Sequence, residues 1–335
     1  MSFFGLDIGS DSIKIIQLKK EGERFHLLGA GMSKTPENGL ESEAEKDLVA
    51  VAEAIKKLKS EANILPIQAV ASLPERSVFT RVIDLPAMSE GEISQALHWE
   101  LEEIVPLPLS EANYDWQIVQ SSASKTSVLV AVSPKTLISK YLHIFELAGL
   151  QPIAFETEVL ATVRALAAIG GEKTKLIVDF GSKSTNIMAT KGEQIILTRS
   201  IPSAGKAVTR AVSGSFSLEE KVAEEYVKTY GLAKEQFEGK MAQAILPVVE
   251  AGINEIKKSL NFCKDEKKEE INLIILSGGM ANLPGLSEII TEQLGIEVQI
   301  ANPFNLITAN ESTLASFKGF ASSFVVAVGL AIREV

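Results

Sequence analysis

Cysteine and positive charge are both scarce in this sequence. Cys263 is the one cysteine among 335 residues, so no disulfide can form within the chain, which fits a reducing compartment. Lysine and arginine number 33 against 43 aspartate and glutamate residues, a formal net charge of −10. Because nucleic acids and anionic membranes attract basic surfaces, the composition argues against a protein that binds either one directly.

Long apolar runs and the common nucleotide loops are missing as well. The longest uncharged apolar run, Gly319–Ile332, is shorter than the roughly 20 residues that span a bilayer. Asp7 and Asp11 interrupt the first apolar residues, which does not match a signal peptide. No Gly-x-x-x-x-Gly-Lys-[Ser/Thr] loop occurs, and no Gly-x-Gly-x-x-Gly follows a strand-like run. We therefore expect a cytoplasmic protein.

One pattern is present twice. Residues 4–16 and 176–188 each contain an apolar run, Asp, one apolar residue, Gly-Ser, any residue, Ser and a second apolar run. Their aspartates, Asp7 and Asp179, are 172 residues apart (179 − 7). The pattern predicts a strand, a tight glycine turn and a returning strand. A single copy would mean little, since these residues favour turns in general, but two copies indicate a duplicated α/β fold.

Other segments have helical periodicity. An amphipathic helix is expected over residues 46–60. Residues 86–151 contain a helix, two strands and a helix in order, which predicts a compact inserted unit. Ser89 and Glu92 have the spacing of a capping box for its first helix, and Gly149 is expected to end its second, Lys135–Ala148. Two further apolar stretches, Phe155–Ala168 and Ala315–Ile332, are predicted to be helices, and the second is expected to pack between the two halves.

The two predicted turns have the composition of a phosphate site. Their backbone N–H groups and hydroxyls suit a phosphate chain, and the preceding aspartate can hold a hydrated Mg²⁺. A glycine pair after the strand-like run 271–276 would let backbone approach a ligand closely. Two such hairpins facing each other would clamp a nucleoside triphosphate. The predicted binding residues are Asp7, Gly9, Ser10, Ser12 and Lys14 in the first hairpin, Asp179, Gly181, Ser182, Ser184 and Thr185 in the second, and Gly278 and Gly279.

This set of motifs resembles the actin-like ATPase superfamily, which includes actin, sugar kinases, heat-shock chaperone ATPases and the cell-division protein FtsA. The resemblance implies duplicated ribonuclease-H-like domains that bind ATP, with Mg²⁺ held through water by Asp7 and Asp179. Glu158-Val159-Leu160-Ala161 is similar to a connecting segment whose glutamate faces the metal and the attacking water, so Glu158 is the candidate catalytic residue. The resemblance adds four nucleotide-binding candidates, which are Gly205, Glu225, Lys228 and Met280.

The inserted stretch narrows the resemblance to the PilM family of type IV pilus assembly proteins, within an FtsA-like subgroup. The similar motifs are Leu85-Pro86-x-Met88-Ser89-Glu90-x-Glu92-Ile93, Trp99-Glu100, Ile104-Val105-Pro106-Leu107-Pro108 and Tyr114-Asp115. The family implies a component of the inner-membrane pilus platform that binds ATP, hydrolyses it slowly at most, and uses it to control lobe closure. Its implied partners are the cytoplasmic tail of a PilN-like membrane protein, held between the first subdomain and the insert, other platform proteins, and further copies of the chain.

The resemblance also implies four subdomains. They are IA (1–85, 152–172 and 321–335), the insert IC (86–151), IIA (173–204 and 265–320) and the helical IIB (205–264). Alternative functions remain open at this point. An FtsA-like division protein normally carries a C-terminal amphipathic membrane helix, and a type II secretion platform ATPase would share the fold. A sugar or acetate-type kinase needs a catalytic Asp facing a substrate hydroxyl.

Overall fold

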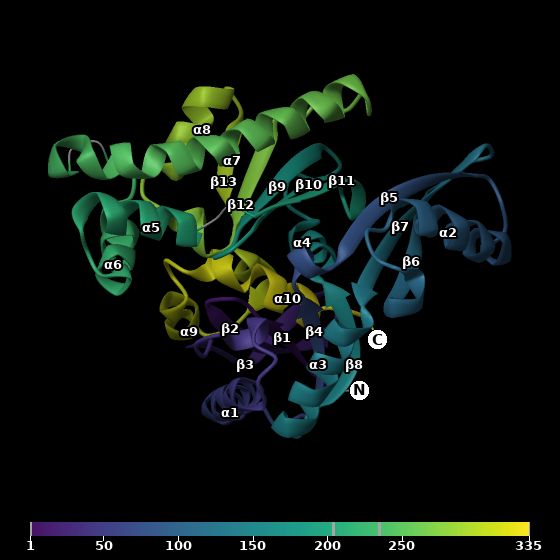
Figure 1. Cartoon of the computed structure of the whole chain (residues 1–335), viewed down its shortest axis with the longest axis horizontal. Helices are drawn as coiled ribbons and strands as arrows, with labels where there is room; N and C mark the ends of the chain where they lie inside the picture. The colour runs from purple at the N-terminus through teal and green to yellow at the C-terminus, as the bar shows by residue number, and fades with distance from the viewer. Residues whose placement is uncertain (1, 203–204, 234–235, 335) are drawn as a thin grey trace.

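The computed structural model describes residues 2–202, 205–233 and 236–334. Two lobes, each built on a β-sheet, lie one above the other in Figure 1, and a smaller inserted unit projects to the right. Helices α4 (Glu158–Leu166) and α10 (Val325–Ala331) lie between the two sheets. Within the described ranges, no helix is long and apolar enough to cross a membrane.

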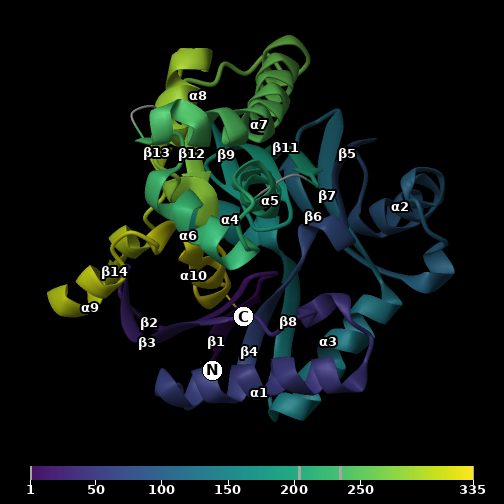
Figure 2. The same cartoon turned by 60° about the vertical axis from the view of Figure 1, so that its left-hand side comes forward.

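The first lobe contains a six-stranded sheet in the order β14-β3-β2-β1-β4-β8. Its strands are β1 (Phe4–Ile8), β2 (Ser12–Glu21), β3 (Arg24–Lys34), β4 (Gln68–Leu73), β8 (Gln151–Thr157) and β14 (Ile307–Thr308). Figure 2 shows α1 (Glu45–Glu61) and α3 (Lys135–Ala148) below this sheet and α10 above it. The faces follow strand alternation, because Ala69 and Ala71 pack in the core with α1 and α3, whereas Val70 packs with α10.

The second lobe repeats the first. Its sheet has the order β11-β10-β9-β12-β13, which matches β3-β2-β1-β4-β8 position by position and confirms the duplication. The strands are β9 (Thr174–Phe180), β10 (Thr185–Lys191), β11 (Gln194–Ile201), β12 (Leu273–Ser277) and β13 (Glu297–Ile300). The helices are α5 (Gly205–Phe216), α6 (Glu220–Tyr230), α7 (Lys240–Asp265) and α8 (Leu286–Leu294).

The inserted unit is a three-stranded antiparallel sheet in the order β5-β7-β6. Its elements are β5 (Phe79–Pro86), α2 (Glu90–Ile104), β6 (Ala112–Ser121) and β7 (Lys125–Pro134). Helix α2 buries Ile93, Leu97 and Leu101 against the sheet. The predicted capping box is present, since the Ser89 N–H donates to Glu92 Oε2 at 2.8 Å and both halves of the box form.

The strand pairing favours bounds for the insert that differ from the predicted residues 86 and 151. Strand β5 pairs with β7 along its whole length, from Phe79 to Pro86. Helix α3 instead buries Tyr141 and Phe145 in the first-lobe core with α1. An amphipathic helix does not reveal in its sequence which sheet it covers. We therefore propose residues 79–134 as the inserted unit.

Two helix predictions near the lobe interface are wrong in their extent. Phe155–Thr157 ends strand β8, and α4 begins only at Glu158, where the Thr157 hydroxyl accepts a hydrogen bond from the Leu160 N–H at 3.3 Å. Residues 315–332 do not form one helix: α9 (Glu311–Ser316) ends before Gly319, whose φ is +95°, and α10 follows after a short 3₁₀ turn. The expectation that this region packs between the halves is confirmed, because α10 is buried along its length.

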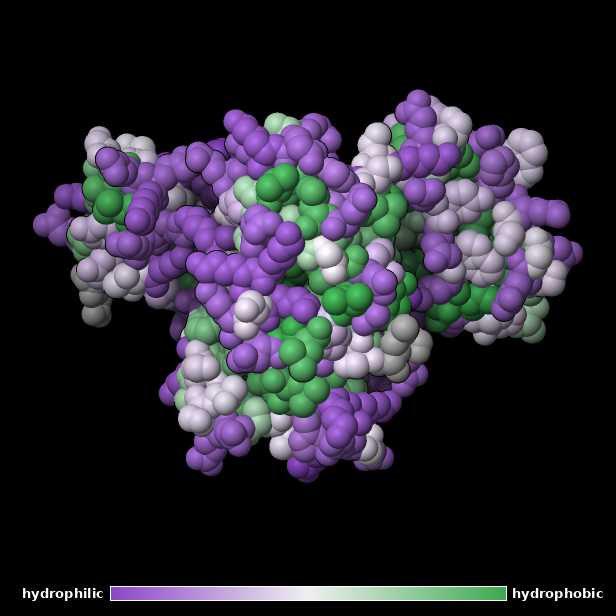
Figure 3. Space-filling view, turned by 90° about the horizontal axis from the view of Figure 1, so that it is seen from below, coloured by the Kyte–Doolittle hydropathy of each residue, from purple (hydrophilic) through white to green (hydrophobic). Residues whose placement is uncertain are grey.

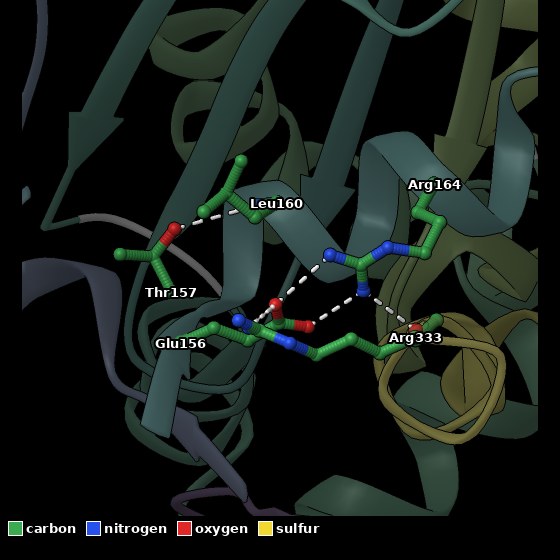
Figure 4. Close-up of polar contacts among 6 residues, drawn as sticks. Glu156, Thr157, Leu160, Arg164 and Arg333 are labelled. Carbon is green, nitrogen blue, oxygen red and sulfur yellow. Dashed lines mark hydrogen bonds and ion pairs between the residues drawn. The ribbon is translucent and has the colours of Figure 1, made fainter. Parts of the chain in front are cut away.

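An ion-pair cluster around the buried Glu156 of β8 joins this strand to the last turn of α4 and to the end of α10. Arg164 donates to both carboxylate oxygens of Glu156, at 2.7 and 2.9 Å, and to the Gly329 carbonyl at 2.7 Å (Figure 4). Arg333 donates to Glu156 Oε2 at 2.5 Å. A carboxylate that is only 2% exposed needs such compensation. The cluster therefore immobilises the β8–α4 junction, where Glu158 lies.

Candidate functional site

The two predicted turns have the same hydrogen bond. In the first, the Gly9 N–H donates to the Ser12 carbonyl at 3.0 Å, and in the second the Gly181 N–H donates to the Ser184 carbonyl at 3.0 Å. A Cβ atom on Gly9 or Gly181 would lie 2.8 or 2.9 Å from that same carbonyl oxygen. Only glycine fits such a turn, which explains why both copies contain it.

Each turn is preceded by a buried aspartate that accepts a hydrogen bond from a serine on the adjacent parallel strand. Ser72 Oγ donates to Asp7 Oδ1 at 3.0 Å, and Ser277 Oγ donates to Asp179 Oδ1 at 2.8 Å. Ser72 was not among the predicted site residues. An alignment of the two halves would have identified Ser72, because it lies near the end of β4 as Ser277 lies at the end of β12. Each of these strands is the parallel neighbour of the strand that carries the aspartate.

The residue opposite each aspartate differs between the copies. Lys14 pairs with Asp7 in the strand register, and its Nζ donates to Asp7 Oδ2 at 3.0 Å. Asn186 occupies the matching place opposite Asp179, but its amide donates to Glu158 Oε2 at 3.2 Å. Asp7 of the first copy is thus paired with the ammonium of Lys14, whereas Asn186 of the second copy links its hairpin to helix α4. Sequence reasoning did not single out Asn186.

Glu158 lies between the two hairpins. Its Oε2 also accepts from the Glu75 N–H at 3.3 Å. Burial raises the pKa of Glu158 to about 8, with further contributions from the charges of nearby carboxylates. Those charges come from Asp7 in one lobe and Asp179 in the other, so both hairpins face this carboxyl. Burial likewise raises the pKa of Glu75 to about 7 and that of Asp179.

The residues at the turns fit Mg²⁺ with a triphosphate. Among the described residues, no group of three or more His, Cys, Asp or Glu side chains could hold a metal alone. Mg²⁺ commonly binds through one or two carboxylates together with waters and substrate phosphates, and Asp7 and Asp179 supply two such carboxylates. Gly278 has φ +86°, and a Cβ there would lie 2.3 Å from the Phe180 carbonyl oxygen, so backbone approaches closely beside Asp179.

Two other predicted residues, Gly205 and Met280, gather at the second turn. The Gly205 N–H donates to the Gly181 carbonyl at 3.2 Å, and the Lys206 N–H to the Ser182 carbonyl at 2.8 Å, so helix α5 begins on this turn. A Cβ on Gly205 would lie 3.1 Å from Met280 Cγ. The N-terminus of a helix and a glycine loop thus meet there, an arrangement that suits an anion. Thr185 is buried, Ser184 is half-buried, and Ser10 and Gly279 are exposed.

Glu225 and Lys228 lie one helical turn apart on α6, with both side chains exposed. Lys228 pairs with Glu224 at 2.5 Å rather than with Glu225. The end of α6 packs on the loop that follows Met280, because the Leu232 N–H donates to the Pro284 carbonyl at 2.8 Å. The helix is therefore next to the segment that contains the predicted nucleotide-binding residues Gly278, Gly279 and Met280, and the side chains of Glu225 and Lys228 face solvent.

In Mg²⁺-free buffer, Glu158→Gln is expected to stabilise the protein more near about pH 9 than near about pH 5. The pKa of Glu158 rises from 4.5 to about 8 on folding, so the folded protein keeps a proton that the unfolded chain releases between these values. Wild-type stability therefore falls as pH rises through this window, by roughly 1.4 kcal/mol per unit of pKa difference. Glutamine does not titrate. Equal stabilisation in denaturant unfolding at both pH values would contradict this pKa.

The structure has two lobes with one strand order, a buried aspartate before a glycine turn in each lobe, and paired helices between the lobes. These features define the actin-like ATPase fold. MreB5 of Spiroplasma citri, solved bound to ADP, has this fold: it matches with a TM-score of 0.56 and 13% identity over 99% of this chain and 96% of that chain. The family can be stated more narrowly. The chain belongs to the family of type IV pilus assembly protein PilM, whose model matches residues 5–335.

Two further comparisons agree with this family. A structure of the PilM-PilN type IV pilus biogenesis complex matches with a TM-score of 0.87 and 27% identity, over 99% of this chain and 98% of that chain. Cell division protein FtsA of Streptococcus pneumoniae serotype 2 (strain D39 / NCTC 7466) is 22% identical over 90% of this chain and 75% of FtsA. The predicted fold and family are confirmed.

Proposed function

We propose that this chain is the ATP-binding, actin-like component of a type IV pilus inner-membrane platform, and that it captures the cytoplasmic N-terminal tail of a PilN-like membrane protein. The observation that carries this proposal is the similarity to a chain of the PilM-PilN complex over 99% of the sequence, insert included. Membrane association then follows from the partner. An FtsA-like division role is supported less, because the identity to FtsA is 22%, whereas the identity to the matched chain of the pilus complex is 27%.

The nucleotide part of the proposal rests on the paired turns. ATP phosphates would lie between the Gly9 and Gly181 turns, and Asp7 and Asp179 would hold hydrated Mg²⁺. When bound, the metal would neutralise phosphate charge. The nucleotide complexes of MreB5 with ADP and AMPPNP support a nucleotide site in this fold. Because the two aspartates lie in different lobes, a ligand held by both favours a closed arrangement of the lobes.

The tail-binding part rests on a hollow of about 670 Å³ on the insert. Its lining combines apolar and polar residues, which are Leu107, Pro108, Leu109, Tyr114, His98, Glu102 and Ser110. The carbonyl of Ser110, which lines the hollow, accepts a hydrogen bond from Lys135, the first residue of α3, at 2.9 Å, so one wall of the hollow is connected to the start of this first-lobe helix. Figure 3 shows a recess between the insert, on the right, and the body of the molecule, with hydrophobic residues inside it.

The charge of the insert suits such a tail. Residues 82–124 contain no Lys or Arg. Their acidic residues are Asp84, Glu90, Glu92, Glu100, Glu102, Glu103, Glu111 and Asp115. Cytoplasmic segments next to membrane-spanning helices carry an excess of Lys and Arg. An acidic surface around an apolar hollow is therefore complementary to a short basic and aliphatic tail.

Tyr114→Ala is expected to weaken binding of a synthetic PilN-like tail peptide by about tenfold or more, because Tyr114 gives the hollow its aromatic wall. Glu102→Lys should weaken it as well, and added NaCl should weaken binding to the wild type. Ile300→Ala is the matched control: Ile300 is 44% exposed, compared with 38% for Tyr114, but lies on the second lobe. If calorimetry gives wild-type affinity for both insert variants, the tail binds elsewhere.

A further inference from the structure

One lysine of the second turn reaches across to the first lobe. Lys183 stands between Ser182 and Ser184, and its ammonium forms an ion pair with the carboxylate of Glu41. Glu41 ends a short 3₁₀ helix, Gly39–Glu41, in the first lobe. The same carboxylate forms a second ion pair with Arg76, whose Nη2 lies 2.8 Å from Glu41 Oε1. We call this Lys183–Glu41–Arg76 arrangement the bridge.

The Glu41 end of the bridge is fixed to the first turn. The Thr35 N–H donates to the Asp11 carbonyl at 2.9 Å, and Thr35 Oγ1 donates to the Gly9 carbonyl at 2.7 Å. Further along the same segment, Lys140 of α3 donates to the Leu40 carbonyl at 3.0 Å. The bridge therefore connects the segment that follows the first turn, in one lobe, to the second turn, in the other.

The Arg76 end lies beside the buried carboxyl between the lobes. Arg76 follows Glu75, whose N–H donates to Glu158 Oε2 at 3.3 Å. Strand β5 of the insert starts three residues later, and Thr198 of the second lobe donates to the Thr80 carbonyl at 3.1 Å. Residues 75–80 thus connect the bridge, the candidate nucleotide site and the base of the insert.

The bridge is built from partly exposed groups. The side chains of Lys183, Glu41 and Arg76 are 23%, 44% and 35% exposed. Ion pairs in such surroundings are weak and can exchange partners. Lys183 makes the largest contribution to lowering the pKa of Glu41, which fits a shared but exchangeable carboxylate. A polyphosphate at the second turn would carry more negative charge than Glu41 and would attract the Lys183 ammonium more strongly.

We propose that Lys183 is a further phosphate-binding residue for which Glu41 competes, so that a nucleotide polyphosphate at the second turn separates Lys183 from Glu41 and leaves Glu41 to Arg76. This inference rests on the proposed binding of nucleotide between the two turns. It assigns Glu41 the role of a competing anion that lowers nucleotide affinity and couples phosphate binding to the segment leading into the insert.

Calorimetry of Mg-ATP binding to the full chain tests the inference with four variants. Lys183→Met should weaken binding by about tenfold, because a charge-assisted contact is lost. Glu41→Gln should strengthen it by about threefold, since the competing carboxylate is gone. In the double variant that combines Lys183→Met with Glu41→Gln, the gain in Mg-ATP affinity from Glu41→Gln should disappear. Lys183→Arg should retain most of the wild-type affinity.

Lys191→Met is the matched control, because Lys191 lies at the far end of strand β10 and pairs with Glu269 at 3.5 Å. It should bind Mg-ATP as the wild type does. If Lys183→Met binds Mg-ATP with wild-type affinity, or if Glu41→Gln binds it more weakly than the wild type, the inference is overturned but the proposed function is not. Failure of the wild-type chain to bind Mg-ATP would overturn the proposed function, and the inference with it.

Discussion

Asp179→Asn is expected to lower the affinity for Mg-ATP by about 100-fold. Asparagine has nearly the same shape and can still accept the hydrogen bond that Ser277 donates to Asp179 at 2.8 Å. It lacks the negative charge that a hydrated Mg²⁺ requires. Because burial raises the pKa of Asp179, removing the charge should not destabilise the fold. Calorimetry gives the affinity, and thermal unfolding checks the fold.

Asp84→Asn is the matched control for this experiment. Asp84 lies in the insert, where it accepts a hydrogen bond from Ser127 at 2.6 Å and pairs with Lys125 at 2.8 Å. The variant therefore removes the same charge from a strand residue that also accepts a serine hydrogen bond, but from one that is exposed and lies away from the turns. Its Mg-ATP affinity should equal that of the wild type. Undiminished binding by Asp179→Asn would show that this carboxylate does not hold the metal.

Gly329→Ala is expected to lower the free energy of unfolding by about 3 kcal/mol or more. Helices α4 and α10 approach so closely at this residue that an added Cβ would lie 1.9 Å from the Ala161 carbonyl oxygen. The helices would have to separate. Their separation would also strain the bond from Arg164 to the Gly329 carbonyl at 2.7 Å. Urea unfolding measures the loss.

Gly91→Ala serves as the comparison for Gly329→Ala. Gly91 also lies within a helix, α2, but nothing is found within 4 Å of the place its Cβ would occupy. Alanine there should stabilise the protein by about 0.5–1 kcal/mol, since it restricts the unfolded chain and favours helix. If Gly329→Ala were as stable as the wild type, α4 and α10 would not cross as closely as described.

Local signals allowed much of the fold to be predicted. The repeated Asp-x-Gly-Ser pattern predicted both hairpins, and the shared strand order of the lobes confirms the duplication. The helix Lys135–Ala148 could be bounded from sequence because Gly149 ends it in the left-handed conformation, with φ 68°. The start of α2 followed from its capping box. In each case the deciding contact joins residues close in sequence.

Contacts between residues distant in sequence could not be predicted in this way. The bond from Ser72 to Asp7 and the contact between Lys183 and Glu41 join segments that only the folded sheets bring together. Strand β8 ends at Thr157 and helix α4 starts one residue later, but a short apolar run fits strand and helix equally well. The assignment of β5 and α3 depended on which sheet each one packs against.

The proposed function is tested most directly by isothermal titration of the full wild-type chain, in Mg-ATP, with a synthetic peptide of the cytoplasmic N-terminal tail of a PilN-like protein. Tail capture at the acidic insert and nucleotide binding between the turns are proposed for the same molecule. We expect saturable binding of one peptide per wild-type chain, and weaker binding of the peptide to Tyr114→Ala. A chain that binds Mg-ATP but gives no heat with the peptide would contradict it.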